Sequence, residues 1–273
     1  MLVLAAVPRT FSAQLMRAAG HRFRFLAAGT WSEAVESILK EPLEMAVVDP
    51  ALEGAPRTQE IERIRVLFPS LPLIVYTDLS PGVVGALLRL GRVGVREVVV
   101  AGHDDHPDRL GELLVHEAAR GLSRKLIDEI ADLLVDCPGQ LKWAIETIVR
   151  EPAAFHTVRD LAERARMDRR TCARWFTKAK LPPPSVVLMV FRVVYAHRLL
   201  QDPGYTVEDV ATKLGYSKAR SFAQHVKEVF GMTPGELRVS LTPDDGIRIV
   251  RERFFRRDEA DEAKVVGSLA SAG

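Results

Sequence analysis

Two groups of residues in this 273-residue sequence have the types and spacing that chemistry requires. The first is Asp49, a carboxylate that ends the apolar run from Met45 to Val48 and is followed by a proline. A carboxylate at the tip of a strand is suited to accept a phosphoryl group, provided that a metal ion and a lysine neutralise the phosphate. The second group consists of basic and polar residues at helical spacing in the C-terminal half, a pattern suited to contacts with nucleic acid.

The elements that must position Asp49 alternate between strand and helix over residues 1–120. Short apolar runs have the length of buried parallel strands, and stretches of helical periodicity lie between them. The expected strands are residues 2–7, 23–29, 45–49, 71–78 and 96–100. This order predicts an α/β fold with a doubly wound, five-stranded parallel sheet of the flavodoxin-like or receiver-like kind.

Residues 157–240 are expected to be entirely helical and contain an internal repeat. Both copies begin with Thr-Val-x-Asp, in which Thr157 or Thr206 caps a helix. A turn follows, and Asp168 or Ser217 is the expected cap of the second helix in each copy. This plan predicts an all-α domain with two helix-turn-helix units.

The second helix of each unit is the one expected to read DNA. Cys172 and Phe176 in the first unit, and Phe222 and Val226 in the second, must face the core, which leaves polar side chains outward. The candidate DNA contacts are Arg169, Arg170, Arg174, Thr177, Lys218, Arg220, Ser221 and Gln224. Arginine can bind guanine through two hydrogen bonds, and glutamine can read adenine. A linker helix over residues 184–202 would place both units in successive major grooves of double-stranded DNA.

The distribution of charge favours the same partner. The net charge is +2, yet residues 157–240 carry 15 Lys/Arg against 8 Asp/Glu, whereas residues 1–120 carry 13 against 15. A polyanion such as DNA is attracted to the basic segment. The two cysteines, Cys137 and Cys172, form no disulfide framework, and no apolar run has the length of a membrane span. We therefore expect a cytoplasmic protein without a membrane segment.

The stretch His103 to Asp108 contains residue types that bind metals. Two histidines and three aspartates occur in "HDDHPD", but no other donor cluster accompanies them, and Pro107 favours the start of a helix. We expect a surface loop here rather than a metal site. No catalytic constellation and no cofactor motif occurs, so the sequence indicates a protein that is not an enzyme.

The C-terminal half resembles the DNA-binding domain of the AraC/XylS family of bacterial transcription regulators over roughly residues 140–240. The family's R-x-x-x-A-x-x-L-L linker helix is matched by Arg192, Ala196, Leu199 and Leu200. Its I-A-x-x-x-G-[FY]-S segment is matched by Val210, Ala211, Gly215, Tyr216 and Ser217, and its closing motif by Lys227, Gly231, Thr233, Pro234 and Arg238. The resemblance implies promoter binding and control of RNA polymerase.

The N-terminal order of elements resembles a response-regulator receiver domain. That resemblance makes Asp49 the phosphate acceptor and Thr77 the hydroxyl residue that ends the fourth strand. The family's acidic pair after the first strand is replaced by a loop that contains Arg9, and its lysine after the fifth strand is replaced by Val100-Ala101-Gly102. Magnesium needs more than one carboxylate at such a site. We therefore expect a degenerate receiver, kept for dimerisation or docking, in which Arg9 pairs with Asp49.

The sequence thus predicts a receiver-like domain at 1–120, a helical connector at 121–139 and an AraC-type DNA-binding domain at 140–240. A solvated mixed-charge helix and a disordered tail are expected at 241–273. The function indicated is sequence-specific DNA binding by a bacterial transcription regulator with a possible homodimeric state. Two alternatives stay open: a response regulator controlled by phosphorylation of Asp49, and a protein-interaction adaptor that has lost DNA binding.

Overall fold

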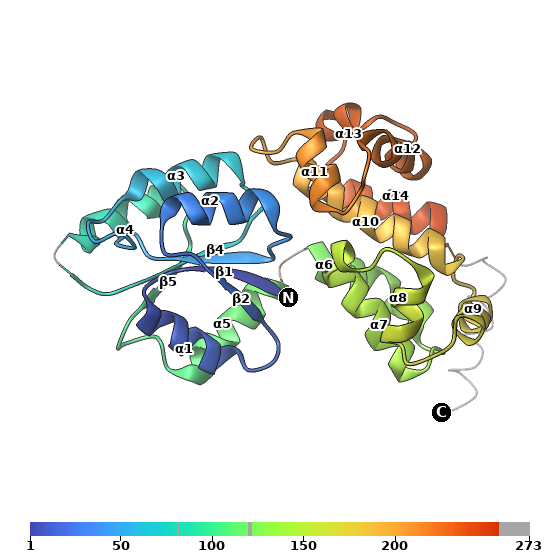
Figure 1. Ribbon diagram of the computed structural model, residues 1–273, viewed down its shortest axis with the longest axis horizontal. Coiled ribbons are helices and arrows are strands. Elements are labelled where there is room, and N and C mark those ends of the chain that lie inside the picture. The colour runs from blue at the N-terminus through green and yellow to red at the C-terminus, as the bar shows by residue number, and fades with distance from the viewer. Residues whose placement is uncertain (81, 120–121, 257–273) are drawn as a thin grey trace, which may run out of the picture.

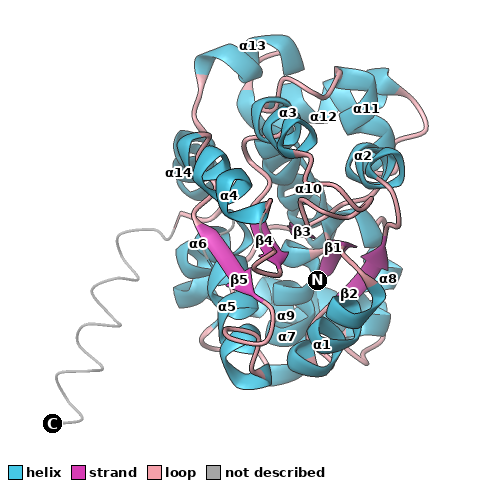
Figure 2. Ribbon diagram, turned by 90° about the vertical axis from the view of Figure 1, so that its left-hand side faces the viewer, coloured by secondary structure: helices cyan, strands magenta, loops and turns pink. Residues whose placement is uncertain are grey.

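The N-terminal half is a parallel sheet with helices on both faces, as the sequence predicts (Figure 2). In the computed structural model, which describes residues 1–80, 82–119 and 122–256, the strand order is β2-β1-β3-β4-β5. The strands are β1 (Leu2–Ala6), β2 (Arg24–Ala27), β3 (Met45–Val48), β4 (Leu73–Thr77) and β5 (Glu97–Val100). This is the flavodoxin-like order, which changes direction between β1 and β3 and leaves a crevice at the carboxyl ends of the strands.

Two layers of helices cover this sheet. Helices α1 (Arg9–Ala19) and α5 (Pro107–Ala119) lie on one face, and α2 (Trp31–Lys40), α3 (Thr58–Leu67) and α4 (Val83–Arg92) lie on the other (Figure 1). Because successive side chains of a strand point to opposite faces, the core is divided between two clusters. Val3 and Val47 belong to the cluster beneath α1 and α5, whereas Leu4 and Val48 face α2 and α3.

The C-terminal half is built around the long helix α10. Its helices are α6 (Leu122–Ile130), α7 (Gly139–Arg150), α8 (Val158–Arg164), α9 (Arg169–Lys178), α10 (Pro184–Leu200), α11 (Val207–Lys213), α12 (Ala219–Phe230), α13 (Pro234–Ser240) and α14 (Pro243–Phe254), with short 3-10 turns η1 (Ala131–Leu134) and η2 (Pro152–Ala154). Helix α10 is apolar all round, which suits a helix that other helices surround. It packs against α7 to α9 on one side and α11 to α14 on the other. Among the described residues, no helix is both long and apolar enough to cross a membrane.

The expected solvated helix after residue 240 is packed instead. The side chains of Ile247, Val250 and Phe255 are buried, because α14 presents an apolar stripe to α10 and α6. Asp244 accepts a hydrogen bond from Lys125 at 2.6 Å at the start of this helix. The predicted disordered tail falls on residues 257–273, which lie outside the described part of the chain.

Candidate nucleic-acid interface

The first helix-turn-helix unit consists of α8 and α9. Thr157 and Asp160 form a capping box at the start of α8, in which the Asp160 amide donates to the Thr157 hydroxyl oxygen at 3.2 Å. Asp168 caps α9 as expected, because its carboxylate accepts from the amide of Thr171 at 2.8 Å. This bond and a second from the Thr171 hydroxyl lower the pKa of Asp168, so the cap stays ionised.

The outer face of α9 carries the arginines that the sequence analysis selected. Cys172 and Phe176 are fully buried beneath the helix, as predicted. The side chains of Arg169, Arg170, Arg174 and Thr177 are exposed. None of the three arginines forms an ion pair with another described residue, so their guanidinium groups face solvent without a protein counter-charge. The Thr177 hydroxyl donates to the carbonyl of Ala173 at 3.2 Å and is thereby partly occupied.

The second unit consists of α11 and α12 and repeats this plan with one difference. Thr206 and Asp209 form the capping box of α11. The expected cap of α12 is wrong: Lys218 occupies the N-cap position and no side chain accepts a bond there, so Ser217 lies one residue too early. Lys218, Arg220, Ser221 and Gln224 are all exposed, as the predicted contacts must be. The Gln224 amide donates to Glu228 at 3.0 Å, one turn further along the helix.

Arg192 in the middle of α10 connects the two units. Its guanidinium is buried, donates to the carbonyl of Phe155 at 2.7 Å just before α8, and lies 5.4 Å from the ring centroid of Tyr216 after α11. Gly215, which precedes Tyr216 in the chain, has φ +74°, and a Cβ atom there would lie 2.3 Å from the ring of His156. Arg192 and Gly215 together determine how closely the turn after α11 approaches the segment that leads into α8.

The comparisons with known proteins address this half of the chain. The helix-turn-helix domain family matches residues 161–240. The C-terminal half contains an AraC-type helix-turn-helix domain. An AraC-like transcription regulator of Streptomyces lividans is 33% identical over 95 residues, 35% of this chain and 31% of that protein. The HTH-type transcriptional regulator AlkR of Acinetobacter baylyi is 28% identical over 137 residues, 50% of this chain and 45% of that protein. The chain therefore spans less than half the length of each of these relatives.

A solved structure of full-length FixJ from B. japonicum is similar at a lower level. It is 14% identical, with a TM-score of 0.37, and the similarity covers 78% of this chain and 96% of that one. A score of this size does not establish a common fold. The receiver-like character of the N-terminal half follows instead from its own strand order.

The AraC-type domain is joined to the α/β domain through its second unit. Lys213 at the end of α11 is buried and donates to the carbonyls of Ile38 and Leu39 at the C-terminal end of α2. The hydroxyl of Tyr205 donates to the same Ile38 carbonyl at 2.7 Å. Lysine suits this position because the last carbonyls of a helix are unpaired and carry partial negative charge. Burial, reinforced by the nearby Arg198 guanidinium, lowers the pKa of Lys213 to about 7.

A second set of contacts joins the end of α10 to α3 and to the loop before β4. Asp202 is buried and accepts from the amide of Ser70 at 2.8 Å and from its hydroxyl at 2.6 Å. The amide of Gly204 donates to the carbonyl of Leu67, and a Cβ atom on Gly204 would lie 2.4 Å from the ring of Phe68. Only glycine permits this approach.

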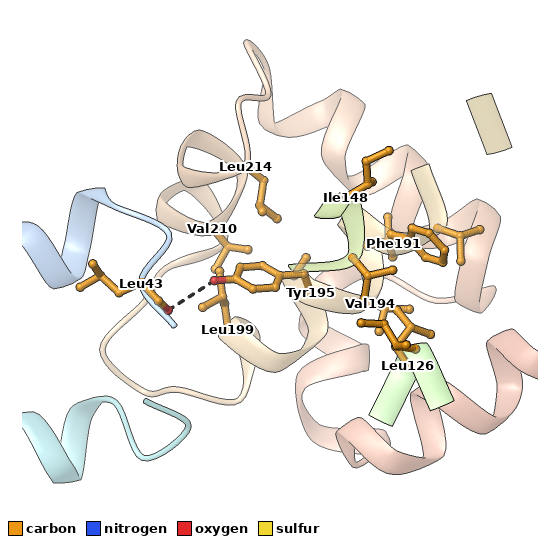
Figure 3. Close-up of a cluster of buried hydrophobic side chains, with 14 of the residues drawn as sticks. Leu43, Leu126, Ile148, Phe191, Val194, Tyr195, Leu199, Val210 and Leu214 are labelled. Atoms are coloured by element: carbon orange, nitrogen blue, oxygen red, sulfur yellow. Dashed lines mark hydrogen bonds between the residues drawn. The ribbon is translucent and has the colours of Figure 1, made fainter. Parts of the chain in front are cut away.

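Apolar packing continues between the polar contacts. In Figure 3, the Leu43 carbonyl before β3 accepts from the hydroxyl of Tyr195 on α10 at 3.5 Å. The ring centroids of Phe68 and Tyr205 lie 4.9 Å apart. One hydrophobic cluster runs from the α2 and α3 side of the sheet into the AraC-type domain. The two halves are therefore packed together rather than joined only by α6.

Asp49 lies at the opposite, carboxyl edge of the sheet from these contacts. Its carboxylate is 4% exposed and accepts from the Thr77 hydroxyl at 2.8 Å and from the Ala51 amide at 2.9 Å. The predicted pair with Arg9 is wrong: Arg9 is exposed at the start of α1 and is not among the groups that act on the Asp49 carboxylate. Burial raises the pKa of Asp49 against these two hydrogen bonds, and Asp78 raises it further. Asp49 is therefore a buried carboxyl group whose neighbours are the Ala51 amide, the Thr77 hydroxyl and a second acid, Asp78.

The segment around His103 is the expected loop before α5. Asp104 pairs with Arg109 at 2.7 Å, and Asp105 accepts from the hydroxyl of Tyr76 at 2.6 Å. Among the described residues, no cluster of three or more His, Cys, Asp or Glu side chains is arranged to hold a metal. Asp104 and Asp105 therefore stabilise the conformation of this loop.

Sequence reasoning missed the residues that join the two halves. Lys213 falls three residues after the buried Val210 and one before the buried Leu214, so helical spacing placed it on the inner face of α11. The sequence therefore did contain a sign that the ammonium group of Lys213 would be buried. Nothing in the sequence, however, indicated that its partner would be Ile38, 175 residues away.

Proposed function

We propose that this protein is a sequence-specific DNA-binding regulator of transcription, in which α9 and α12 enter successive major grooves of double-stranded DNA. The α/β domain is proposed to act as a docking or dimerisation module without phosphorylation of Asp49. Control of RNA polymerase and a homodimeric state belong to the same proposal, since AraC-type domains occur in transcription regulators.

One observation carries the proposal: the exposed side of α9 presents Arg169, Arg170 and Arg174 with no acidic partner among residues 1–80, 82–119 and 122–256, in the helix that a helix-turn-helix inserts into the groove. An arginine without a counter-charge is available to phosphate or to the guanine edge. The proposed contacts on α12 are Lys218, Arg220, Ser221 and Gln224. The buried Arg192 supports joint use of the two helices because it contacts both units.

The test is DNA selection followed by affinity measurement at several salt concentrations. We expect selection of a defined sequence from a random pool and a steep loss of affinity as salt rises. Arg170→Ala should weaken binding by about 1–3 kcal/mol and relax preference at one position. Arg63→Ala on α3, also exposed, is the matched control and should bind like the wild type.

Two outcomes would favour the alternatives. Selection of no sequence, together with binding that does not respond to salt, would indicate an adaptor that has lost DNA. Incubation with acetyl phosphate and intact-mass measurement addresses the other alternative, since a receiver of the switching kind should gain a phosphoryl group that Asp49→Asn prevents. We expect no phosphoryl adduct on the wild type.

A further inference from the structure

A cavity of about 850 Å³ lies between the α/β domain and the first helix-turn-helix unit. One wall is formed by the segment that leads into β2 and by the end of α5. The other is formed by α7, η2 and the end of α8. The cavity is separate from the contacts through Lys213 and from the proposed DNA-reading faces.

The lining combines apolar side chains with basic ones. Phe155 and the α5 residues Val115 and Ala118 contribute apolar surface. Four arginines line the cavity (Arg22, Arg24, Arg150 and Arg164), against the single carboxylate of Glu151. The Glu151 carboxylate already accepts from the terminal amine of Met1 at 2.8 Å and lies 3.9 Å from Arg24. Arg150 lies 3.7 Å from Glu146 in an exposed pair, which offsets its charge only weakly.

Trp143 on α7 gives the cavity a flat aromatic surface. Its side chain is 51% exposed, an unusual position for a residue of this size. The guanidinium carbon of Arg164 lies 4.1 Å from the centre of a Trp143 ring, so the indole and the cation form one platform. Arginine and an aromatic ring together bind flat organic groups by stacking while the guanidinium attracts an acid group.

In the first unit, the cavity lies where the second unit has a direct contact with the α/β domain, as the repeat in the sequence shows. Arg164 follows Thr157 by seven residues, and Lys213 follows Thr206 by seven residues, so the two cations hold equivalent positions in the two units. Lys213 reaches the α/β domain directly through the carbonyls of α2. Arg164 lines the cavity together with residues of that domain, and it forms no hydrogen bond or ion pair with any described residue of the α/β domain.

We propose that the cavity binds a small organic anion with a flat apolar body, such as an aromatic carboxylate or a nucleotide. The body would stack at Trp143 and the acid group would be held by Arg164 and its neighbouring arginines. Such a ligand would bridge the first unit to the α/β domain, as Lys213 bridges the second. The binding step stands by itself, and only the effect on DNA rests on the function proposed above.

Calorimetric titration of the full chain tests the binding step with two probes, 2-naphthoate and adenosine 5′-monophosphate. We expect one of them to bind with a Kd below about 1 mM. Arg164→Gln and Trp143→Leu should each weaken that binding about tenfold, the effect of losing one charge-assisted contact. Arg63→Gln, an exposed arginine on α3, is the matched control and should bind like the wild type.

The outcomes separate the possible ligands. Binding of 2-naphthoate alone assigns the site to aromatic carboxylates, and binding of the nucleotide alone assigns it to nucleotides. Adenosine and inorganic phosphate should each bind more weakly than the nucleotide, because each lacks one half of the recognised chemistry. The proposal is overturned if neither probe binds, if Arg164→Gln binds the probe as tightly as the wild type does, or if phosphate alone binds as tightly as the nucleotide.

A second measurement tests the bridge. Because coupling between two ligands is reciprocal, a probe that changes DNA affinity must have its own affinity changed by the same factor when DNA is bound. We expect a change of fivefold or more in both, in line with about 1 kcal/mol of coupling. Equal DNA affinity with and without bound probe would overturn the bridge. Loss of DNA binding with normal probe binding would contradict the proposed function instead.

Discussion

The two helix-turn-helix units begin with the same capping box, yet the rest of the molecule holds them differently. In the second unit, Tyr205 and Lys213 contact the α2 end of the α/β domain directly. In the first unit, the equivalent residues are His156 and Arg164, which are exposed. Helices α8 and α9 form no hydrogen bond or ion pair with the α/β domain in the described part of the chain.

This difference shows that two units with the same sequence pattern can make different contacts with the rest of the molecule. A polar network and a shared apolar core join the second unit to the α/β domain. The first unit is held through α7, α10 and Arg192. We therefore expect a conformational change in the α/β domain to affect the position of α12 directly. It should affect α9 only through the middle of α10.

The largest effect should follow the removal of the ring that joins the second unit to the α/β domain. Tyr205→Ala should lower the free energy of unfolding by about 3–5 kcal/mol, because the ring packs on Phe68 and leaves a cavity. His156→Ala, at the equivalent position of the first unit, should cost about 1 kcal/mol or less because the side chain is exposed. Urea denaturation of both variants measures the difference. Equal losses of unfolding free energy would contradict the difference between the two units in their contacts with the α/β domain.

The two turns should respond with opposite signs. Gly215→Ala places a side chain at φ +74° and against His156, which should destabilise the fold by about 2 kcal/mol. The equivalent residue of the first unit, Arg166, already holds φ 52°, so Arg166→Gly should relieve strain and stabilise by up to about 1 kcal/mol. Thermal unfolding followed by circular dichroism gives both signs. A stabilising Gly215→Ala would contradict the close contact between the units.

Lys213 should make stability depend on pH. Its pKa is about 7 in the folded protein, far below the ordinary value of 10.5, so the unfolded chain binds more protons between these values. The free energy of unfolding should therefore rise with pH above 7, by at most about 1.4 kcal/mol per pH unit from this group. Denaturation at pH 7, 8 and 9 measures the slope. Lys213→Met should remove it, whereas Arg164→Met in the first unit should leave it unchanged, since arginine stays charged throughout.

The smallest effect concerns the caps of α9 and α12, the helices proposed to read DNA. Asp168→Ala should destabilise α9 by about 1 kcal/mol, because it removes the bonds to Thr171. Ser217→Ala should change stability by no more than about 0.5 kcal/mol, because α12 has no side-chain cap. Urea denaturation curves compare the two variants. A larger loss for Ser217→Ala would mean that the second unit is capped after all.

Several features of the fold could be read directly from the sequence. The five strands and their alternation with helices were predicted correctly, as were the capping boxes at Thr157 and Thr206 and the outward position of the α9 arginines. Each depends on residues within a few positions of one another. The cap at Ser217 failed because one residue of difference in the turn moves the start of a helix. The Arg9–Asp49 pair failed because the direction of a loop side chain is set by packing that spacing does not encode.

The sequence by itself determined the local elements, the repeat and which faces are apolar, because backbone hydrogen bonding and burial impose fixed periods of about 3.6 and 2 residues. Only the tertiary structure decided which unit joins the α/β domain. That choice depends on Ile38 meeting Lys213 and on Ser70 meeting Asp202, residues 175 and 132 positions apart. Contacts over such distances follow from how two finished surfaces fit, which no local pattern records.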